Sequence, residues 1–359
     1  MSSMNRRTLL ALGLLAATPV TARLDEPTSW AELSANENPW GPGPKAREAI
    51  RTAIAEGGRY GMRALRALTQ SLATHEKVDP TQLAIGSGSG ELLHMAALRW
   101  ARTGRLVCAS PTFNQLMAYA RKLGATIDAV PLNPELVHDL PAMATKIDSS
   151  VGLVYICNPN NPTGTVVNAK ALADFCRTHA KSSCVVVDEA YIDLIESGAT
   201  ESMSRLAINT PNILVLRTFS KTHGLAGLRV GYALGHPDTI NELKSLQMAF
   251  PNTLGLEAAR ASLQDEIFLS DCRRKIQRAR QQLQSHCQNL GFDHSDSHGN
   301  FIFVRTGLAH SQVASHMAEH RIRVGRPFAP REDYCRISVG TETETSRLME
   351  AFTDLKQKS

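Results

Sequence analysis

The stretch "SCVVVDEA", residues 183–190, decides the fold, because four apolar residues in a row run directly into two acids. A short continuous apolar run rich in valine is typical of a strand that is buried on both faces of a parallel sheet. Amphipathic segments such as 114–124 alternate with such runs along the chain. The order strand, helix, strand predicts an open α/β domain with a mostly parallel sheet. The same apolar pattern recurs at residues 151–158, 212–220 and 228–235.

The bulk composition is that of an ordinary globular protein. The chain has 359 residues, 43% of them hydrophobic and 20% charged, which excludes a disordered class. The net charge of +5 is scattered, so no nucleic-acid partner is expected. From residue 251 on, the predicted helices become rich in Arg and Gln. We therefore predict an N-terminal arm at 23–44, a large domain at 45–250 and a smaller α+β domain at 251–359.

The first 22 residues have the composition of a signal peptide. Arg6 and Arg7 precede an apolar run at 9–17 that is too short to span a membrane, and small residues end at Ala22. The paired arginines favour the twin-arginine export machinery, with the mature protein in the periplasm and no stable membrane insertion after cleavage. A Sec signal, whose arginines are only its positive region, stays open. If the signal is not functional, the protein is expected in the cytoplasm.

Polar residues follow the ends of four predicted strands, which is where open α/β sheets bind their ligands. A lysine amine bonds to aldehydes, and pyridoxal 5'-phosphate (PLP) is an aldehyde cofactor that also needs an acid at its ring nitrogen and a phosphate site. The glycine-rich turn is not the G-x-G-x-x-G of dinucleotide sites. Together these residues favour PLP. The four sets are Gly88, Ser89 and Gly90; Asn161; Asp188 and Tyr191; and Thr218, Ser220 and Lys221.

Five motifs together resemble the class I/II aminotransferases of fold type I, and among them the histidinol-phosphate aminotransferase branch. The resemblance covers about residues 34–355. It implies a PLP-dependent enzyme that moves an amino group between an amino acid, or a histidinol-phosphate-like amine, and a 2-oxo acid. The motifs are "ANENP" at 35–39, "NPNNPTG" at 158–164, "DEAY" at 188–191, "TFSKTHGLAGLRVGY" at 218–232 and "RISVGT" at 336–341.

The resemblance also implies a role for each residue at the cofactor. Lys221 is the lysine that forms the Schiff base and moves the proton, and Asp188 pairs with the pyridine nitrogen. Asn161 and Tyr191 bind the phenolic oxygen, and the ring lies between Phe113 and Ala190. Tyr60 reaches into the phosphate site of a partner subunit, so a homodimer is expected. The phosphate-binding residues are Gly88, Ser89, Gly90, Thr218, Ser220 and Arg229.

At the substrate end the resemblance implies that Arg336 binds the α-carboxylate, and the candidates beside it are Asn36, Trp40, Arg326 and Asn300. Gly90 stands where the family often has Asp, and an inserted Gly325 displaces Arg326. The second departure predicts preference for a carboxylate-bearing amino acid, with a bulky or aromatic side chain, over histidinol phosphate.

The sequence raises two other functions and one other site. A decarboxylase on the same scaffold, similar to threonine-phosphate decarboxylases, stays open. A PLP-binding transcription regulator is disfavoured, because no helix-turn-helix segment precedes residue 34. His316 and His320 are four residues apart on a predicted helix, but the sequence reveals no third ligand, so no metal site is expected.

Overall fold

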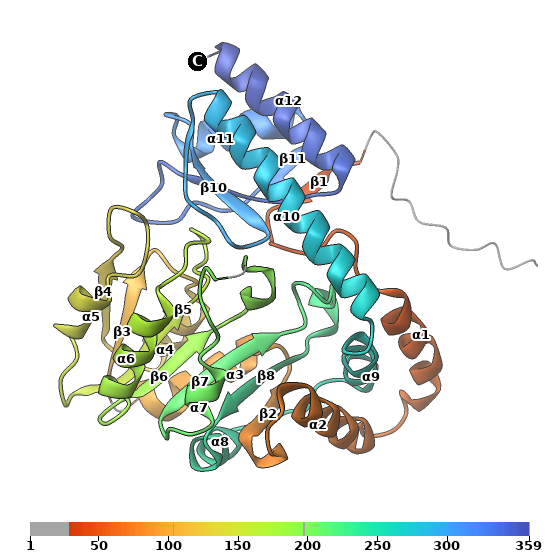
Figure 1. The fold of residues 1–359 in the computed structure, drawn as a ribbon, viewed down its shortest axis with the longest axis vertical. Helices are drawn as coiled ribbons and strands as arrows, with labels where there is room; N and C mark the ends of the chain where they lie inside the picture. Colours follow the sequence, from red (N-terminus) through yellow and green to blue (C-terminus); the bar gives the residue numbers. More distant parts are fainter. Residues whose placement is uncertain (1–28, 103, 197, 359) are drawn as a thin grey trace, which may run out of the picture. The chain divides into compact units, whose positions relative to one another are not determined.

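The computed structural model describes residues 29–102, 104–196 and 198–358 (Figure 1). The predicted signal peptide, 1–22, and the first part of the predicted arm, 23–28, lie outside the described residues. Residues Ala31–Ser359 form one compact unit, which contains both predicted domains. The boundary between those domains at residue 250 stays a prediction.

The largest sheet of this unit has seven strands and lies in the lower part of Figure 1. Its strand order is β2-β8-β7-β6-β5-β3-β4. β8 runs antiparallel to its neighbours β2 and β7, and the other neighbouring pairs are parallel. The prediction of a mostly parallel α/β sheet is therefore confirmed. The strands are β2 (Leu83–Gly86), β3 (Arg105–Ser110), β4 (Ile127–Pro131), β5 (Val151–Cys157), β6 (Cys184–Asp188), β7 (Ile213–Thr218) and β8 (Gly231–Gly235).

The apolar strands supply two separate core clusters, one on each face of the sheet. In β6, Val185 and Val187 belong to one cluster, whereas Cys184 and Val186 belong to the other. Side chains alternate between the faces of a strand, so a strand buried on both faces must be apolar throughout. Each fully buried valine contributes roughly 1.5–3 kcal/mol.

Helices cover the sheet and build the rest of the unit. α1 begins with Pro44 at its first turn, where proline costs no backbone hydrogen bond. α9 packs against α1 and α2. The helices are α1 (Pro44–Ala53), α2 (Met62–Glu76), α3 (Ser89–Ala96), α4 (Gln115–Lys122), α5 (Leu140–Ala144), α6 (Ala169–His179), α7 (Ser204–Ala207), α8 (Pro237–Lys244), α9 (Thr253–Ser262), α10 (Glu266–Asn289), α11 (His310–Glu319) and α12 (Glu342–Lys358).

The C-terminal part contains two small sheets and a third core cluster. β12 (Cys335–Ser338), β10 (Phe301–Arg305) and β9 (Asp293–His294) are antiparallel. The middle of the predicted arm forms β1 (Ala31–Leu33), which pairs in parallel with β11 (Ile322–Val324). This pairing holds the residues after Leu33 close to the C-terminal strands. Within the part of the chain that the structure describes, no helix combines the length and the apolar character needed to cross a membrane.

Candidate active site

A cavity of about 370 Å³ lies where the central parallel strands end. β5, β6 and β7 run in the same direction, so the polar residues that follow them meet at one edge of the sheet. Residues that the sequence did not single out as ligands also line the cavity, among them Glu37, Gln115 and Cys157. The predicted residues that line it are Ser89, Gly90, Phe113, Asn161, Asp188, Ala190, Tyr191, Thr218, Ser220, Lys221 and Arg229.

The Lys221 amine is held by backbone oxygens of the arm. Its Nζ donates to the carbonyl of Asn36 at 2.9 Å and lies 5.3 Å from the centre of the Tyr191 ring. Burial, together with the positive charge of Arg336, lowers the pKa of Lys221 to about 8. A larger share of the amine is therefore neutral, and hence nucleophilic, near neutral pH than in a solvated lysine.

Asp188 is a buried carboxylate at the end of β6, with only 2% of its surface exposed. Its oxygens accept hydrogen bonds from the Tyr155 hydroxyl at 3.0 Å and from the Ala190 amide at 3.2 Å. Burial raises the pKa of Asp188 to about 6 in spite of these donors. Tyr155 was missed from the sequence. The sequence does contain a signal that could have identified it. Tyr155 is a lone tyrosine in an apolar strand, and a buried hydroxyl needs a hydrogen-bond partner.

A chain of side chains links the arm to the substrate end. The Tyr191 hydroxyl accepts from Asn36 Nδ2 at 3.0 Å and from Asn161 Nδ2 at 3.4 Å. Asn161 Oδ1 in turn accepts from the Arg336 guanidinium at 2.8 Å. Asn36 has a left-handed backbone, with φ at 53°, and its amide donates to Ser338 Oγ. Asn36 thus holds Tyr191 and Lys221 in place rather than lining the cavity.

The predicted phosphate end is assembled around the start of α3. Gly88 precedes this helix with φ at +82°, and a Cβ there would come within 2.3 Å of the Arg229 guanidinium. Only glycine allows the arginine to lie across the helix start. The Thr218 and Ser220 hydroxyls are hydrogen-bonded to each other at 2.9 Å at the same cavity. Helix N–H groups, hydroxyls and a guanidinium are the donors that a phosphate requires.

Gly90, which stands where the family often has Asp, packs directly against Gln115. A Cβ at this position would lie 2.6 Å from Gln115 Nε2. Gln115 in turn lies 3.2 Å from His94 Nε2, and it also lines the cavity. The side-chain amide of Gln115 therefore occupies the space beside Gly90. The sequence did not reveal this contact.

Arg336 and Arg326 lie on the same aromatic ring, although neither lines the cavity. The guanidinium carbons of Arg336 and Arg326 lie 5.1 Å and 4.2 Å from the centre of the Phe328 ring. Arg336 is buried and also donates to the Ser34 carbonyl, whereas Arg326 is exposed and donates to Asn114 Oδ1 at 3.0 Å. Burial lowers the pKa of Arg336, and the positive charge of Arg326 lowers it further.

Three other predicted residues do not line this cavity. Trp40 packs against the C-terminal core cluster, and the Lys275 ammonium lies 5.7 Å from its ring centre. Asn300 is fully buried and donates to the Glu37 carbonyl at 2.9 Å. Tyr60 is 98% exposed and lines a different hollow, of about 550 Å³, with residues of α1 and α9.

The residues at the cavity fit PLP. Asp188 is a buried carboxylate whose charge lacks a compensating cation at hydrogen-bond distance among the described residues, and a protonated ring nitrogen would supply one. The donors around the start of α3 suit its phosphate, and the Lys221 amine suits its aldehyde. When bound, PLP supplies an electron sink for the carbon that carries the amino group.

Comparisons with known proteins show the family of the chain. Residues 28–352 match the model of the family described as Aminotransferase class I and II. Histidinol-phosphate aminotransferase 2 of Pseudomonas fluorescens is 39% identical over 335 residues, which cover 91% of this chain and 89% of that protein. Histidinol-phosphate aminotransferase of Bacillus cytotoxicus is 34% identical over 330 residues, 90% of this chain and 88% of that protein.

A solved structure of a related aminotransferase has a similar fold. The histidinol-phosphate aminotransferase of Sinorhizobium meliloti, crystallised in complex with pyridoxal-5'-phosphate, superimposes with a TM-score of 0.86 at 29% identity, covering 92% of this chain and 91% of that one. These matches support transamination rather than the decarboxylation that the sequence left open. The chain therefore belongs to the class I and II aminotransferase family of fold type I, and it is a PLP-dependent aminotransferase.

Proposed function

We propose that this aminotransferase binds the α-carboxylate of an amino acid, and of the corresponding 2-oxo acid, at Arg336. One observation carries the proposal: the buried Arg336 guanidinium has no carboxylate at ion-pair distance among the described residues, and its Nε–H has no hydrogen-bond partner there. A buried charge without a counter-ion is costly, so this group calls for an anionic ligand. A carboxylate satisfies a guanidinium fork bidentately.

The residues around the cavity have separate roles in the proposed reaction. Lys221 is the base that takes the proton from the substrate carbon and returns it at a neighbouring atom. Asp188 keeps the ring nitrogen protonated, because its charge is stabilised by that pairing. Asn161 links the two ends of the site, since it bonds both Tyr191 and Arg336. The hydrogen bond that Arg336 donates to Asn161 Oδ1 orients the guanidinium and so its remaining N–H groups.

Histidinol phosphate is the second candidate substrate, because the relatives at 34–39% identity carry its name. It lacks the α-carboxylate but brings a phosphate. The Arg326 and Arg336 guanidiniums both lie against Phe328, so a doubly charged phosphate could engage both of them. The preference for amino acids predicted from the sequence rests on the inserted Gly325, which displaces Arg326 from its position in the family pattern.

The two arginines separate these substrates. Arg336→Ala should lower kcat/KM for the preferred amino acid by roughly 10- to 150-fold, since one bidentate charge-assisted contact contributes about 1.5–3 kcal/mol. Arg326→Ala should change that value little, because a single carboxylate needs only Arg336. Steady-state kinetics with a panel of amino acids and histidinol phosphate tests this. A kcat/KM that is highest for histidinol phosphate, and that falls in both variants, would reject the preference for amino acids.

We also propose a homodimer in which Tyr60 completes the phosphate site of the partner subunit. Tyr60 is almost fully exposed and does not line the cavity of its own chain. The exposed apolar side chains of Ile54 and Met62 lie near it in the sequence and would be covered by a partner.

Mixing two inactive variants tests the shared site. Tyr60→Ala and Lys221→Ala should each be weakly active or inactive alone. In a hybrid dimer one site receives Lys221 from one chain and Tyr60 from the other, so mixing after subunit exchange should restore activity at about a quarter of the sites. No recovery in dimers shown to be hybrid, or a fully active monomer in sedimentation, would contradict the proposal.

We propose that the chain is exported by the twin-arginine route. The proposal rests on Arg6, Arg7 and the short apolar run, which lie outside the described residues. Changing both arginines to lysine keeps the positive charge and removes the pair. The double variant should stay in the cytoplasm of a bacterial host, uncleaved. Continued export to the periplasm would assign the signal to the Sec route instead.

A further inference from the structure

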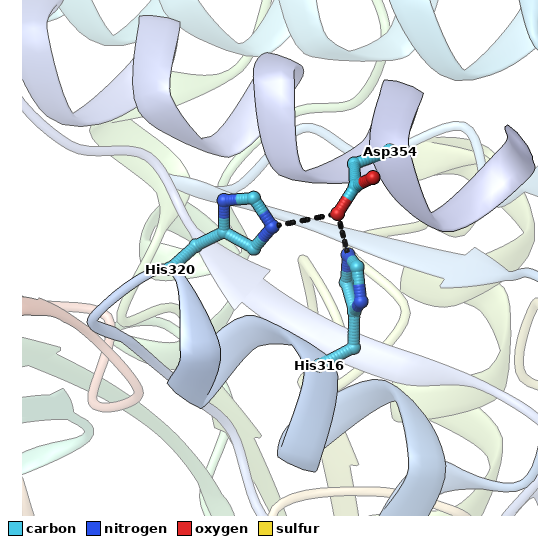
Figure 2. A group of neighbouring side chains, drawn as sticks. All are labelled: His316, His320 and Asp354. Carbon is cyan, nitrogen blue, oxygen red and sulfur yellow. Dashed lines mark hydrogen bonds and ion pairs between the residues drawn. The ribbon is translucent and has the colours of Figure 1, made fainter. Parts of the chain in front are cut away.

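The side chains of His316, His320 and Asp354 converge in the C-terminal part, and none of them lines the PLP cavity (Figure 2). His316 lies in the last turn of α11 and His320 directly follows the helix, with ring centres 4.9 Å apart, and α11 packs against α12, which carries Asp354. Asp354 is the third group that the sequence could not reveal, because 34 residues separate it from His320. The three groups therefore form a cluster of metal-ligand type that transamination does not use.

We propose that His316, His320 and Asp354 form a binding site for a divalent transition-metal ion such as Zn²⁺. Asp354 Oδ2 lies 3.1 Å from His320 Nε2 and 3.8 Å from His316 Nε2. Tetrahedral zinc with bonds of about 2.0–2.1 Å places its ligand atoms roughly 3.3 Å apart, so small side-chain rotations suffice. Two imidazoles and one carboxylate suit Zn²⁺, whereas Mg²⁺ and Ca²⁺ require oxygen ligands.

Neighbouring groups support the ligands. Glu319 Oε2 lies 3.9 Å from His316 Nδ1, too far for a hydrogen bond but close enough for its negative charge to favour a cation bound at the imidazole. His316 is nearly buried, but His320 and Asp354 are partly exposed, so an ion can enter from solvent.

Two contacts compete with the metal. The Lys358 ammonium lies 2.8 Å from Asp354 Oδ2, and His316 Nε2 lies 2.9 Å from the Ala351 carbonyl oxygen. Lys358 is exposed, and exposed ion pairs contribute little, so a divalent ion can displace it. The His316 contact is one hydrogen bond to a backbone oxygen, and the ion must replace it with a stronger bond. Lys358 therefore weakens metal binding modestly, and its removal should strengthen it.

The test uses the PLP-loaded full chain without a histidine tag, freed of metal with a chelator. Zn²⁺ titrated in a calorimeter should bind at one site per chain, and Mg²⁺ should not. His320→Gln and Asp354→Asn should each weaken Zn²⁺ at least about 10-fold, since even an outer partner of a ligand is typically worth 10- to 100-fold. Lys358→Met should tighten binding by roughly two- to fivefold.

His286→Gln is the matched control. His286 also rests on α12, with Nε2 2.9 Å from the Met349 carbonyl oxygen, but it lies outside the cluster, so its loss should leave Zn²⁺ affinity unchanged. Zn²⁺ should also raise the melting temperature of the wild type and not that of His320→Gln, because a ligand of the folded state stabilises it. The proposal is wrong if the wild type takes up no Zn²⁺, if His320→Gln and Asp354→Asn bind it like the wild type, or if Lys358→Met binds it more weakly.

Discussion

Lys221→Ala should lower kcat by at least about 10 000-fold and leave the fold intact. A single group that transfers a proton contributes typically 10²- to 10⁴-fold, and Lys221 also forms the covalent bond to PLP. PLP should still bind to the variant through Asp188 and the donors around the start of α3, because neither contact needs the lysine. Single-turnover and steady-state transamination assays, with PLP content measured by absorbance, test both parts.

A control variant separates this effect from the loss of a lysine elsewhere. Lys244, at the end of α8, is exposed and does not line the cavity. Lys244→Ala should retain full turnover. Wild-type turnover in Lys221→Ala, without an added small amine to replace the lysine, would show that Lys221 is not the reacting group.

The lowered pKa of Lys221 predicts how the apoprotein takes up PLP. Only the neutral amine can bond to an aldehyde. With a pKa of about 8, the neutral fraction rises roughly tenfold per pH unit below that value and levels off above it. The rate of PLP uptake should follow this curve in stopped-flow measurements. An uptake rate that still rises steeply above about pH 9 would mean that the amine is not buried in this way.

Asp188→Asn should have the second-largest effect on activity. Breaking a buried ion pair costs about 3–5 kcal/mol, so kcat/KM should fall by roughly 100- to 5000-fold. Asparagine has nearly the same shape and can still accept from the Ala190 amide, but it carries no charge to hold a proton on the ring nitrogen. Steady-state kinetics and PLP dissociation measured by dialysis test the expectation.

Stability of the apoprotein gives this variant an independent readout. Burial raises the pKa of Asp188 from its usual 3.8 to about 6, so without PLP the carboxylate destabilises the fold as pH rises through that window. At about pH 8 apo Asp188→Asn should therefore melt no lower than the wild-type apoprotein. Activity lost together with stability would point to misfolding rather than to the ring nitrogen.

The adjacent acid provides the control. Glu189 is equally buried, but its carboxylate pairs with Arg217 at 2.9 Å and accepts from the Met203 amide, and it does not line the cavity. Glu189→Gln should lower the melting temperature, because it leaves Arg217 without its buried partner, and should keep kcat near the wild-type value. The two neighbouring acids thus separate a role at the cofactor from a role in the fold.

The sequence by itself determined the sheet and the centre of the site. Strands buried on both faces must be apolar throughout, so residues 183–190 and the similar runs were recognisable without partners. Lys221 and Asp188 were recognisable too, because parallel strands deliver the residues after their ends to one edge. Their placement at one cavity follows from local sequence and from this rule alone.

Only the tertiary structure decided which distant residues complete these features. The left-handed backbone of Asn36 brings the arm to Tyr191 and Lys221, and Gln115 fills the space beside Gly90. Asp354 joins His316 only because α12 packs on α11. Contacts between residues so far apart in the chain depend on packing directions and side-chain rotamers, and neither hydrophobic periodicity nor motif spacing encodes these.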